Sequence, residues 1–576
     1  MIVDFLEVDG TEKVHQVLEK FGSYCRENKE GVPIVVVNHG VNLQSVLTNG
    51  DFRRLLQSSE NALQNVRIYE AFDLNTKNYI GDDESLYLFD NVRFIQNIKA
   101  QIDQSLSITS GSVEWIAVTS NCKIKGFVSW AELDKPNLLN TEVFIHGMGF
   151  VGLSLAVVLA AAGLAVKGIE VDPRQLATIS EGIAPFEESG LSELLKSGLA
   201  EGRLSFSDSL ASCRLKKQFA VHVICVGTDI DGQGEIDLTP LSKIIRDISA
   251  FGEYDCIIIR STVGLGHTRS SIASILDDFQ DFSFCPERLA EGSAIEELSN
   301  IPQLVGAQTE RAKQFSELIF GASGSPVIHM ESVESAELAK LAMNSVRDVT
   351  FAVTNALIPL AASHNIDLTK MVSQANTEYP RTKLARPSHV VGGYCLTKDP
   401  VILASQYGPG SQESSFFHIG RKINSNGLEY CLSIYEQEFS DSEKKLMRIL
   451  LVGIAFKGLP ANSDGRGNYV NQLLNRLRKD SKDVYAYDAV ISGKVVTENF
   501  DMKSWDNNSH EPLAIFVLNN HPKNVGVVKE AINRNGVKFV FDPWSLINGK
   551  LTDCDQDFIY VNLTKKLRVN RIFNSS

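Results

Sequence analysis

The sequence predicts an α/β protein of several domains, in which helices alternate with the strands of parallel sheets. Three observations predict this class: a length of 576 residues, the alternation of short apolar runs with helical stretches, and a glycine-rich turn at Gly147–Gly152 between a strand and a helix. At about 150 residues per domain, the length is enough for about four domains. We expect these units at residues 1–138, 139–328, 329–440 and 441–576.

The composition is that of an ordinary globular protein, with 43% hydrophobic and 22% charged residues. The 56 Lys and Arg against 70 Asp and Glu give a net charge of −14, which argues against non-specific binding to nucleic acid or to an anionic membrane. No run of about 18 apolar residues and no leader-like first segment is present, so neither export nor membrane insertion is expected. Nine cysteines without paired short spacings favour the reducing cytoplasm and predict no metal site.

The first unit contains an internal repeat. Residues 37–51 and 118–132 match at a constant offset of 81, and each copy predicts a strand, a turn and a second strand. A hydroxyl residue then precedes an acid by three positions, as Thr48 and Asp51 in the first copy and as Ser129 and Glu132 in the second. This pattern resembles a tandem pair of CBS modules, which implies an adenine nucleotide at Thr48 and Asp51. A ligand-free pair that only packs two sheets or dimerises remains open.

The second unit begins with a dinucleotide-binding pattern. Residues 142–146 predict a strand, Gly147, Gly149 and Gly152 form the turn that leads through Phe150 and Val151, and residues 153–164 predict a helix. Here Gly147 permits the tight turn, Gly149 lets the backbone approach a pyrophosphate, and Gly152 lets helix and strand pack closely.

An acid follows this turn at the expected distance. Glu170 ends the next predicted strand, residues 166–170, where a carboxylate can hold the ribose diol and repel a 2′-phosphate. We therefore expect NAD, with NADP left open by the nearby Arg174. Further strands at 219–226 and 256–259 complete a parallel sheet.

The second half of the chain changes character twice. Residues 331–436 are predicted to be mainly helical, and apolar runs at 448–453, 484–487, 513–518 and 538–541 predict a second α/β domain.

One cysteine has an unusual setting. Cys395 follows Gly392 and Gly393 and precedes Lys398 and Asp399. The glycines allow close approach to the backbone, and a nearby cation favours the nucleophilic thiolate. Alternatively, Cys395 is an inert core residue.

Six motifs in order connect these segments to one family. They are Gly147-x-Gly-x-x-Gly152, Ser261-Thr262-Val263, Pro286-Glu287-Arg288-Leu289-Ala290-Glu291-Gly292, Glu337-x-x-Lys340-x-x-x-Asn344, Gly392-Gly-x-Cys395-x-x-Lys398-Asp399 and Gly453-Ile-Ala-Phe456-Lys457-Gly458. Over about three-quarters of its length, the chain resembles the UDP-glucose/GDP-mannose dehydrogenases. The resemblance implies NAD-dependent oxidation of a nucleotide-sugar primary alcohol to the acid.

The resemblance also implies roles for individual residues. Cys395 would hold the aldehyde between two oxidations, Lys340 would stabilise the oxyanion, and Asn344 and Asp399 would place a water. Glu287 would be the base for that water, although an acid in this position could equally cap a helix or lie on the surface.

The same resemblance assigns the ligand contacts. Further cofactor contacts would come from Thr228, Thr262, Glu291 and Lys398. Substrate contacts would come from Arg347, Arg381, Gly392, Phe456, Lys457 and Arg466, among which the arginines and Lys457 supply cations for a diphosphate.

The substrate class is narrowed by two short runs. Arg347-Asp348-Val349 and Tyr379-Pro380-Arg381 resemble the branch that acts on UDP-N-acetylhexosamines, whose uronic acid product enters polysaccharide. UDP-glucose 6-dehydrogenase and a non-catalytic UDP-sugar sensor remain alternatives. The helical middle is expected to form a homodimer or a higher homo-oligomer.

Overall fold

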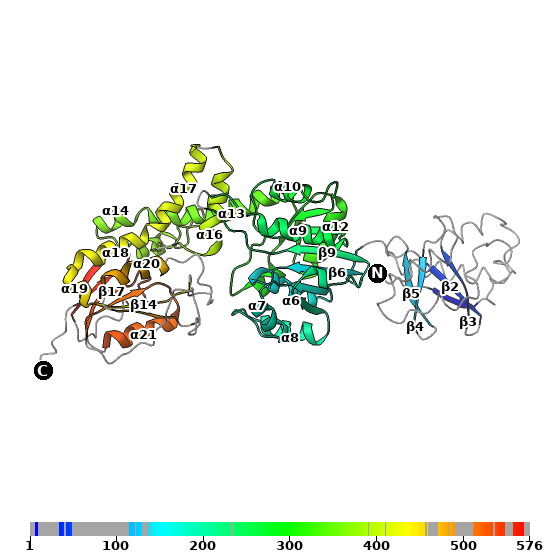
Figure 1. Ribbon diagram of the computed structural model, residues 1–576, viewed down its shortest axis with the longest axis horizontal. Coiled ribbons are helices and arrows are strands. Elements are labelled where there is room, and N and C mark those ends of the chain that lie inside the picture. The colour runs from blue at the N-terminus through cyan, green and yellow to red at the C-terminus, as the bar shows by residue number, and fades with distance from the viewer. Residues whose placement is uncertain are drawn as a thin grey trace. The chain divides into compact units, whose positions relative to one another are not determined.

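The computed structural model describes two units of the chain separately, Met1–Thr141 and Glu142–Ser576 (Figure 1). It describes five strands before residue 136, and then residues 136–569 with gaps. These gaps are residues 139, 232–233, 390, 409, 456–457, 459–469, 482, 489, 491–510, 534–535 and 548–556. No helix in the described part has the length and apolarity needed to cross a membrane.

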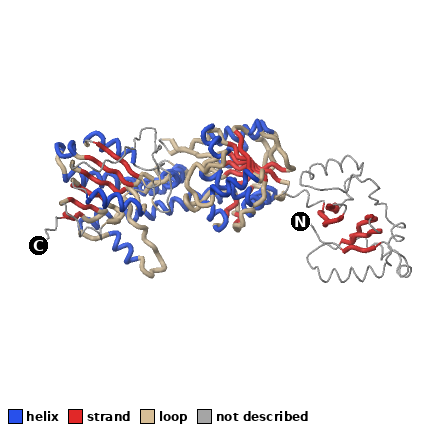
Figure 2. The backbone as a smooth tube through the Cα atoms, turned by 90° about the horizontal axis from the view of Figure 1, so that it is seen from below, coloured by secondary structure: helices blue, strands red, loops and turns tan. Residues whose placement is uncertain are grey.

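The first unit, whose described strands are red in Figure 2, contains two antiparallel strand pairs that follow the sequence repeat. β2 (Ile34–His39) pairs with β3 (Asn42–Thr48), and β4 (Trp115–Ser120) pairs with β5 (Lys123–Ser129). All four boundaries keep the offset of 81, and so does a register shift, which follows Val37 in one pair and Val118 in the other. β1 (Leu6–Asp9) runs parallel to β2. The predicted strands of the repeat are thus confirmed, whereas Asp51 lies outside the described residues.

The second unit begins with an eight-stranded sheet in the order β13-β12-β11-β10-β9-β6-β7-β8. Six strands of it, β6 to β11, follow the doubly wound order 3-2-1-4-5-6 of dinucleotide-binding domains. The pairs β6–β7, β7–β8, β9–β10, β10–β11 and β12–β13 are parallel, and β11–β12 is antiparallel. The strands are β6 (Thr141–His146), β7 (Ala165–Ile169), β8 (Leu204–Ser207), β9 (Phe219–Ile224), β10 (Cys256–Ile259), β11 (Phe282–Phe284), β12 (Gln303–Ala307) and β13 (Val327–His329).

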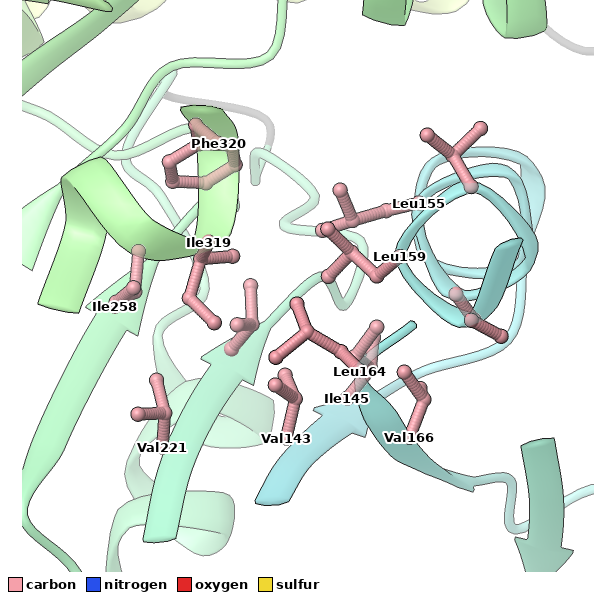
Figure 3. Close-up of a cluster of buried hydrophobic side chains, with 14 of the residues drawn as sticks. Val143, Ile145, Leu155, Leu159, Leu164, Val166, Val221, Ile258, Ile319 and Phe320 are labelled. Carbon is pink, nitrogen blue, oxygen red and sulfur yellow. The ribbon is translucent and has the colours of Figure 1, made fainter. Parts of the chain in front are cut away.

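Helices cover this sheet, and the hydrophobic core lies between the helices and the strands. They are α6 (Phe150–Ala161), α7 (Pro173–Ser180), α8 (Leu191–Ala200), α9 (Thr239–Phe251), α10 (His267–Ala273), α11 (Ala294–Asn300) and α12 (Glu310–Gly321). Figure 3 shows Leu155 and Leu159 of α6 next to the fully buried Val143 and Ile145 of β6, and Ile319 of α12 next to the fully buried Ile258 of β10. α6 is almost uniformly apolar and begins at Phe150, three residues earlier than predicted. It ends before Gly163, whose φ is +101°.

A helical region follows, as predicted. It contains α13 (Val333–Asn355), α14 (Ile358–Ser363), α15 (Leu368–Ala375), α16 (Tyr394–Ser405), α17 (Gln412–Ser425), α18 (Gly427–Glu438) and α19 (Asp441–Leu446). The longest, α13, begins at the N-cap Ser332, whose hydroxyl accepts a hydrogen bond from Ser335 N at 3.1 Å. It packs against both α16 and α17.

The second α/β domain has the strand order β15-β14-β16-β17-β18-β19 and confirms the four predicted strands. Its elements are β14 (Arg448–Val452), α20 (Val470–Asp480), β15 (Asp483–Tyr487), β16 (Leu513–Val517), α21 (Pro522–Asn533), β17 (Val537–Phe541), β18 (Phe558–Val561) and β19 (Lys566–Val569). Because β14 lies between β15 and β16, the strand order reverses beside β14, and ligands of such folds bind at this point.

Candidate active site

The glycine turn has the geometry that the sequence predicts. Gly147 has φ +90°, and its N–H donates to Ile169 O at 2.9 Å. A Cβ on Gly152 would lie 1.9 Å from Gly147 O, whereas a Cβ on Gly149 would meet no atom within 4 Å. The turn is therefore closed at Gly152 and open at Gly149, which precedes the N-terminus of α6. Phe150 and Val151 form the half-buried first turn of that helix.

Glu170 lies beside this turn. Its carboxylate accepts hydrogen bonds from Met148 N at 3.0 Å and from Asp172 N at 2.9 Å. These bonds hold the acid next to the open side of the turn, where a ribose would follow a pyrophosphate. Arg174, in contrast, has an exposed side chain. The turn and the acid together fit a bound dinucleotide.

Two residues of α13 contact the dinucleotide domain and α16, the helix that contains Cys395. Lys340, which is only 3% exposed, donates to Glu287 O at 2.5 Å, and its Nζ lies 3.5 Å from Glu287 Oε2. One turn later, Asn344 Nδ2 donates to Asp399 Oδ2 at 2.6 Å. Thus α13 connects the segment after β11 with α16.

Cys395 lies in the first turn of α16, after Gly393 with φ +93°. Burial raises the pKa of its thiol to about 11, and the charges of Asp399 and Glu287 act in the same direction, against Lys340 and Lys398. All four charges therefore act on the sulfur. Although burial alone would lower the pKa of Lys340, Glu287, Asp399 and Cys395 raise it, so Lys340 remains charged.

The structure thus brings the five predicted catalytic residues together from three segments of the chain. They are Cys395, Lys340, Glu287, Asn344 and Asp399.

A second cluster joins α16 to the dinucleotide domain. Lys398 Nζ donates to Thr228 O at 2.5 Å and lies 3.3 Å from Thr228 Oγ1, while Thr228 Oγ1 donates to Thr262 O at 2.6 Å. Burial lowers the pKa of Lys398. These predicted cofactor residues therefore lie at the carboxyl ends of β9 and β10.

Tyr394 belongs to this cluster and was missed by the sequence analysis. Its hydroxyl contacts Thr228 O at 3.1 Å and Asp229 Oδ1 at 2.7 Å, and its ring centroid lies 4.0 Å from Lys398 Nζ. The only sequence signal was a tyrosine directly before the predicted nucleophile.

The remaining predicted site residues differ in their exposure to solvent. Gly392 and Glu291 are half-buried, and Arg347 and Arg381 are exposed. The predicted substrate residues Phe456, Lys457 and Arg466 lie outside the described residues. Among the described residues, no three His, Cys, Asp or Glu side chains form a group that could hold a metal.

Fold and site together define a dinucleotide-binding α/β enzyme with a half-buried thiol next to its dinucleotide domain. Residues 141–322 match the NAD binding domain of the UDP-glucose/GDP-mannose dehydrogenase family, and residues 334–426 match the central domain of that family. The chain is similar to this family over these two domains, and it is an NAD-dependent nucleotide-sugar dehydrogenase.

Curated relatives carry names of the same enzyme class, and solved structures are similar in fold. The UDP-N-acetyl-D-mannosamine dehydrogenase of Pyrococcus horikoshii is 27% identical over 68% of this chain and 93% of the relative. That of Methanocaldococcus jannaschii is 24% identical over 74% of this chain and 97% of the relative. The fold is similar to the solved structure of the P. horikoshii enzyme, with a TM-score of 0.61 and 24% identity over 70% of this chain and 94% of that one. It is also similar to a UDP-glucose dehydrogenase from Pyrobaculum islandicum, with a TM-score of 0.59 and 23% identity over 69% and 93%.

Proposed function

We propose that this protein oxidises the 6-hydroxyl of a UDP-N-acetylhexosamine to the uronic acid in two steps, with Cys395 holding the carbon between them. One observation carries the proposal: a half-buried thiol lies among Lys340, Glu287 and Asp399 and is joined through Lys398 to the NAD-binding domain. NAD, when bound, accepts a hydride in each oxidation. The overall change consumes one water and two NAD, and it yields the carboxylate, two NADH and three protons.

The thiol has to lose its proton when it attacks the aldehyde. Because its pKa is about 11, Cys395 is mostly protonated at neutral pH. The carboxylates of Asp399 and Glu287, whose charges act on the sulfur, are suited to receive the proton as the C–S bond forms. The charged Lys340 then stabilises the tetrahedral oxyanion, an interaction typically worth about 3 kcal/mol.

The thioester formed by the second oxidation is cleaved by water. Glu287 is the proposed base, held by Lys340, and Asn344 and Asp399 orient the water through their shared hydrogen bond. The proton of the water passes to Glu287, and the thiolate leaves and is reprotonated. These steps return Cys395 to its starting state.

The residues that would contact NAD and the UDP-sugar are proposed from their positions in the fold and in the sequence motifs. The glycine turn, with Phe150, Val151, Glu170 and Arg174, and the cluster of Thr228, Thr262, Glu291 and Lys398 would hold NAD. Arg347, Arg381, Gly392, Phe456, Lys457 and Arg466 would hold the UDP-sugar. The names of the two archaeal relatives support UDP-N-acetyl-D-mannosamine as the first substrate to test.

The test is the number of NADH formed per sugar consumed, with UDP-ManNAc, UDP-GlcNAc, UDP-GalNAc and UDP-glucose in turn. Two NADH with an N-acetylhexosamine, lost in Cys395→Ala but kept in Cys213→Ala, would support the proposal. Cys213 is a matched control because it is a buried cysteine whose Sγ bonds only to Ser209 O among the described residues. Turnover of UDP-glucose alone would assign the alternative substrate, and no turnover of any sugar would favour a sensor.

We also propose a homodimer through the helical region. Val346 and Val353 of α13 and Phe416 and Ile419 of α17 are each more than half exposed, although the two helices pack against each other. An apolar face of this kind fits a second copy. Val346→Glu should convert a dimer to a monomer in analytical ultracentrifugation. A monomeric parent protein would contradict the proposed homodimer.

For the first unit we propose an adenine nucleotide at Thr48 and Asp51. The support is the repeat, which keeps both its strand boundaries and its register shift at the offset of 81. AMP, ADP or ATP should raise the melting temperature or change activity, and Asp51→Ala should abolish that response. No response to any of the three would exclude the site.

A further inference from the structure

The active-site face of α13 continues beyond the two residues assigned above. Lys340, Asn344 and Asp348 are spaced by four residues and so lie on one side of the helix. Asp348 is fully buried, and its carboxylate has no part in the mechanism described so far. A buried carboxylate in a folded protein needs compensating partners.

The partners of Asp348 come from α17. Arg421 Nη1 donates to Asp348 Oδ1, and Asn424 Nδ2 donates to both Asp348 O and Asp348 Oδ1 at 2.8 Å. Arg421 is 8% exposed and Asn424 is fully buried. The ion pair is thus shielded from solvent, and the Asp348 carboxylate is held in one orientation by two donors, Arg421 and Asn424.

The same partners hold the segment that leads to the thiol. Arg421 Nη2 donates to Val391 O at 3.2 Å, and Val391 N donates to Asn424 O at 3.3 Å. Both backbone groups of Val391, four residues before Cys395, are therefore bonded to α17.

A second anchor lies three residues earlier. Ser388 N donates to Asn355 Oδ1 at 2.9 Å, and Asn355 Nδ2 donates to Asn424 Oδ1 at 2.9 Å. Since two glycines then follow, the chain before Cys395 has little stiffness of its own, and its position depends on these bonds.

We infer that Asp348 is a positioning residue for Cys395, acting by holding Arg421 against the Val391 carbonyl. In this way α13, which carries Lys340 and Asn344, also determines where the thiol lies relative to these two residues. The inference rests on the proposed function, because it assigns the network to aldehyde capture rather than to the first oxidation.

The test is Asp348→Asn, which keeps the shape but removes the charge that orients Arg421. The first oxidation needs no thiol and should continue, whereas the aldehyde should escape and be trapped by hydroxylamine. We expect the NADH formed per sugar to fall from two toward one.

Alkylation of Cys395 by iodoacetamide, followed by peptide mass spectrometry, gives a readout that does not depend on turnover. A loosened segment exposes the thiol, and each unit by which its pKa falls raises the thiolate fraction at neutral pH about tenfold. Alkylation in Asp348→Asn should therefore be faster than in the parent protein.

Two further variants separate positioning from stability. Arg421→Lys keeps a cation beside Asp348 but replaces the two nitrogens that bond Asp348 and Val391 with one, so it should also release the aldehyde and speed alkylation. It tests the inference independently if Asp348→Asn fails to fold. Glu337→Gln alters a fully buried carboxylate of the same helix that accepts from Gly266 N and Thr268 N, away from the Cys395 segment. It should melt earlier yet keep two NADH per sugar and the parent alkylation rate.

Two NADH per sugar and an unchanged alkylation rate in folded Asp348→Asn or Arg421→Lys would overturn the inference and leave the proposed function standing. If the parent protein forms no NADH, the proposed function fails, and the alkylation rates still decide the positioning role.

Discussion

Asn344 on α13 and Asp399 on α16 are joined by a hydrogen bond of 2.6 Å from the amide nitrogen to Oδ2. The bond spans 55 residues of sequence and connects the helix that carries Lys340 with the helix that carries Cys395. Burial raises the pKa of Asp399, whereas Lys340 and this hydrogen bond lower it. The ionisation of Asp399 therefore depends on Asn344.

Asn344→Ala should move the acid limb of activity to higher pH. The pKa of Asp399 is already raised, and without the amide it rises further, so the ionised carboxylate is lost at a higher pH as the pH falls. A hydrogen bond to a charged group is worth about 1.5–3 kcal/mol, which corresponds to a shift of about one pH unit or more. The measurement is kcat/KM from pH 5 to 9. Thr350→Ala, on an exposed turn of the same helix, is the control, and an unshifted profile in Asn344→Ala would exclude this role for the amide.

A pair of glycine variants should separate cofactor binding from folding. Gly149→Ala places its Cβ in open space, so stability should be kept while NAD binding weakens at least tenfold, because the methyl occupies the approach of the pyrophosphate. Gly152→Ala places its Cβ 1.9 Å from Gly147 O, and overpacking of this kind costs about 1–3 kcal/mol.

Melting curves and NAD titration by calorimetry measure both effects. Equal losses of stability in the two variants would contradict the assigned geometry.

The sequence predicted the strands and the first dinucleotide turn because these depend on local patterns. The apolar run of β6, the glycines after it and Glu170 at the end of the next strand all fall within 30 residues. The catalytic residues were reached through ordered motifs, since no periodicity shows that Lys340 and Glu287, 53 residues apart, meet. Phe456, Lys457 and Arg466, outside the described residues, stay predictions.

The anchoring network was not predicted, for a physical reason. Arg421 and Asn424 lie on a helix with many polar residues, where an arginine and an asparagine resemble an ordinary solvated face. Only the partner 73 residues earlier, Asp348, makes them a buried group. The spacing of Lys340, Asn344 and Asp348 was the one available signal, because it places three polar residues on a single side of a helix that packs against two others.

Lys340→Met should make the thiol harder to ionise. Burial raises the thiol pKa to about 11, and Lys340 is the first of the groups that lower it, so its removal raises the pKa above this value. One further unit would reduce the thiolate fraction, and thus Cys395 alkylation at pH 9, by about tenfold. Alkylation rates from pH 7 to 11 test the shift, with Lys313→Met as a partly exposed control. A rate that increases in Lys340→Met would contradict the electrostatic role.

Tyr394→Phe should weaken the connection between the thiol helix and the cofactor domain without removing any proposed catalytic group. The phenol is bonded to Thr228 O and to Asp229 Oδ1, and Lys398 donates to the same Thr228 carbonyl. Because Asp229 is exposed, the loss should be that of an ordinary hydrogen bond, about 0.5–1.5 kcal/mol, or roughly a threefold to tenfold rise in KM for NAD. The KM for the UDP-sugar should stay within about twofold, since the hydrogen bonds of the phenol to Thr228 O and Asp229 Oδ1 both lead to the dinucleotide domain.

Steady-state kinetics with each substrate varied in turn would measure both constants, and Tyr407→Phe, whose ring stacks on Phe417, provides the matched control. A change confined to the UDP-sugar KM would show that Tyr394 serves the substrate instead. In that case Lys398 alone would join α16 to Thr228, and Lys398→Met rather than Tyr394→Phe should raise the KM for NAD.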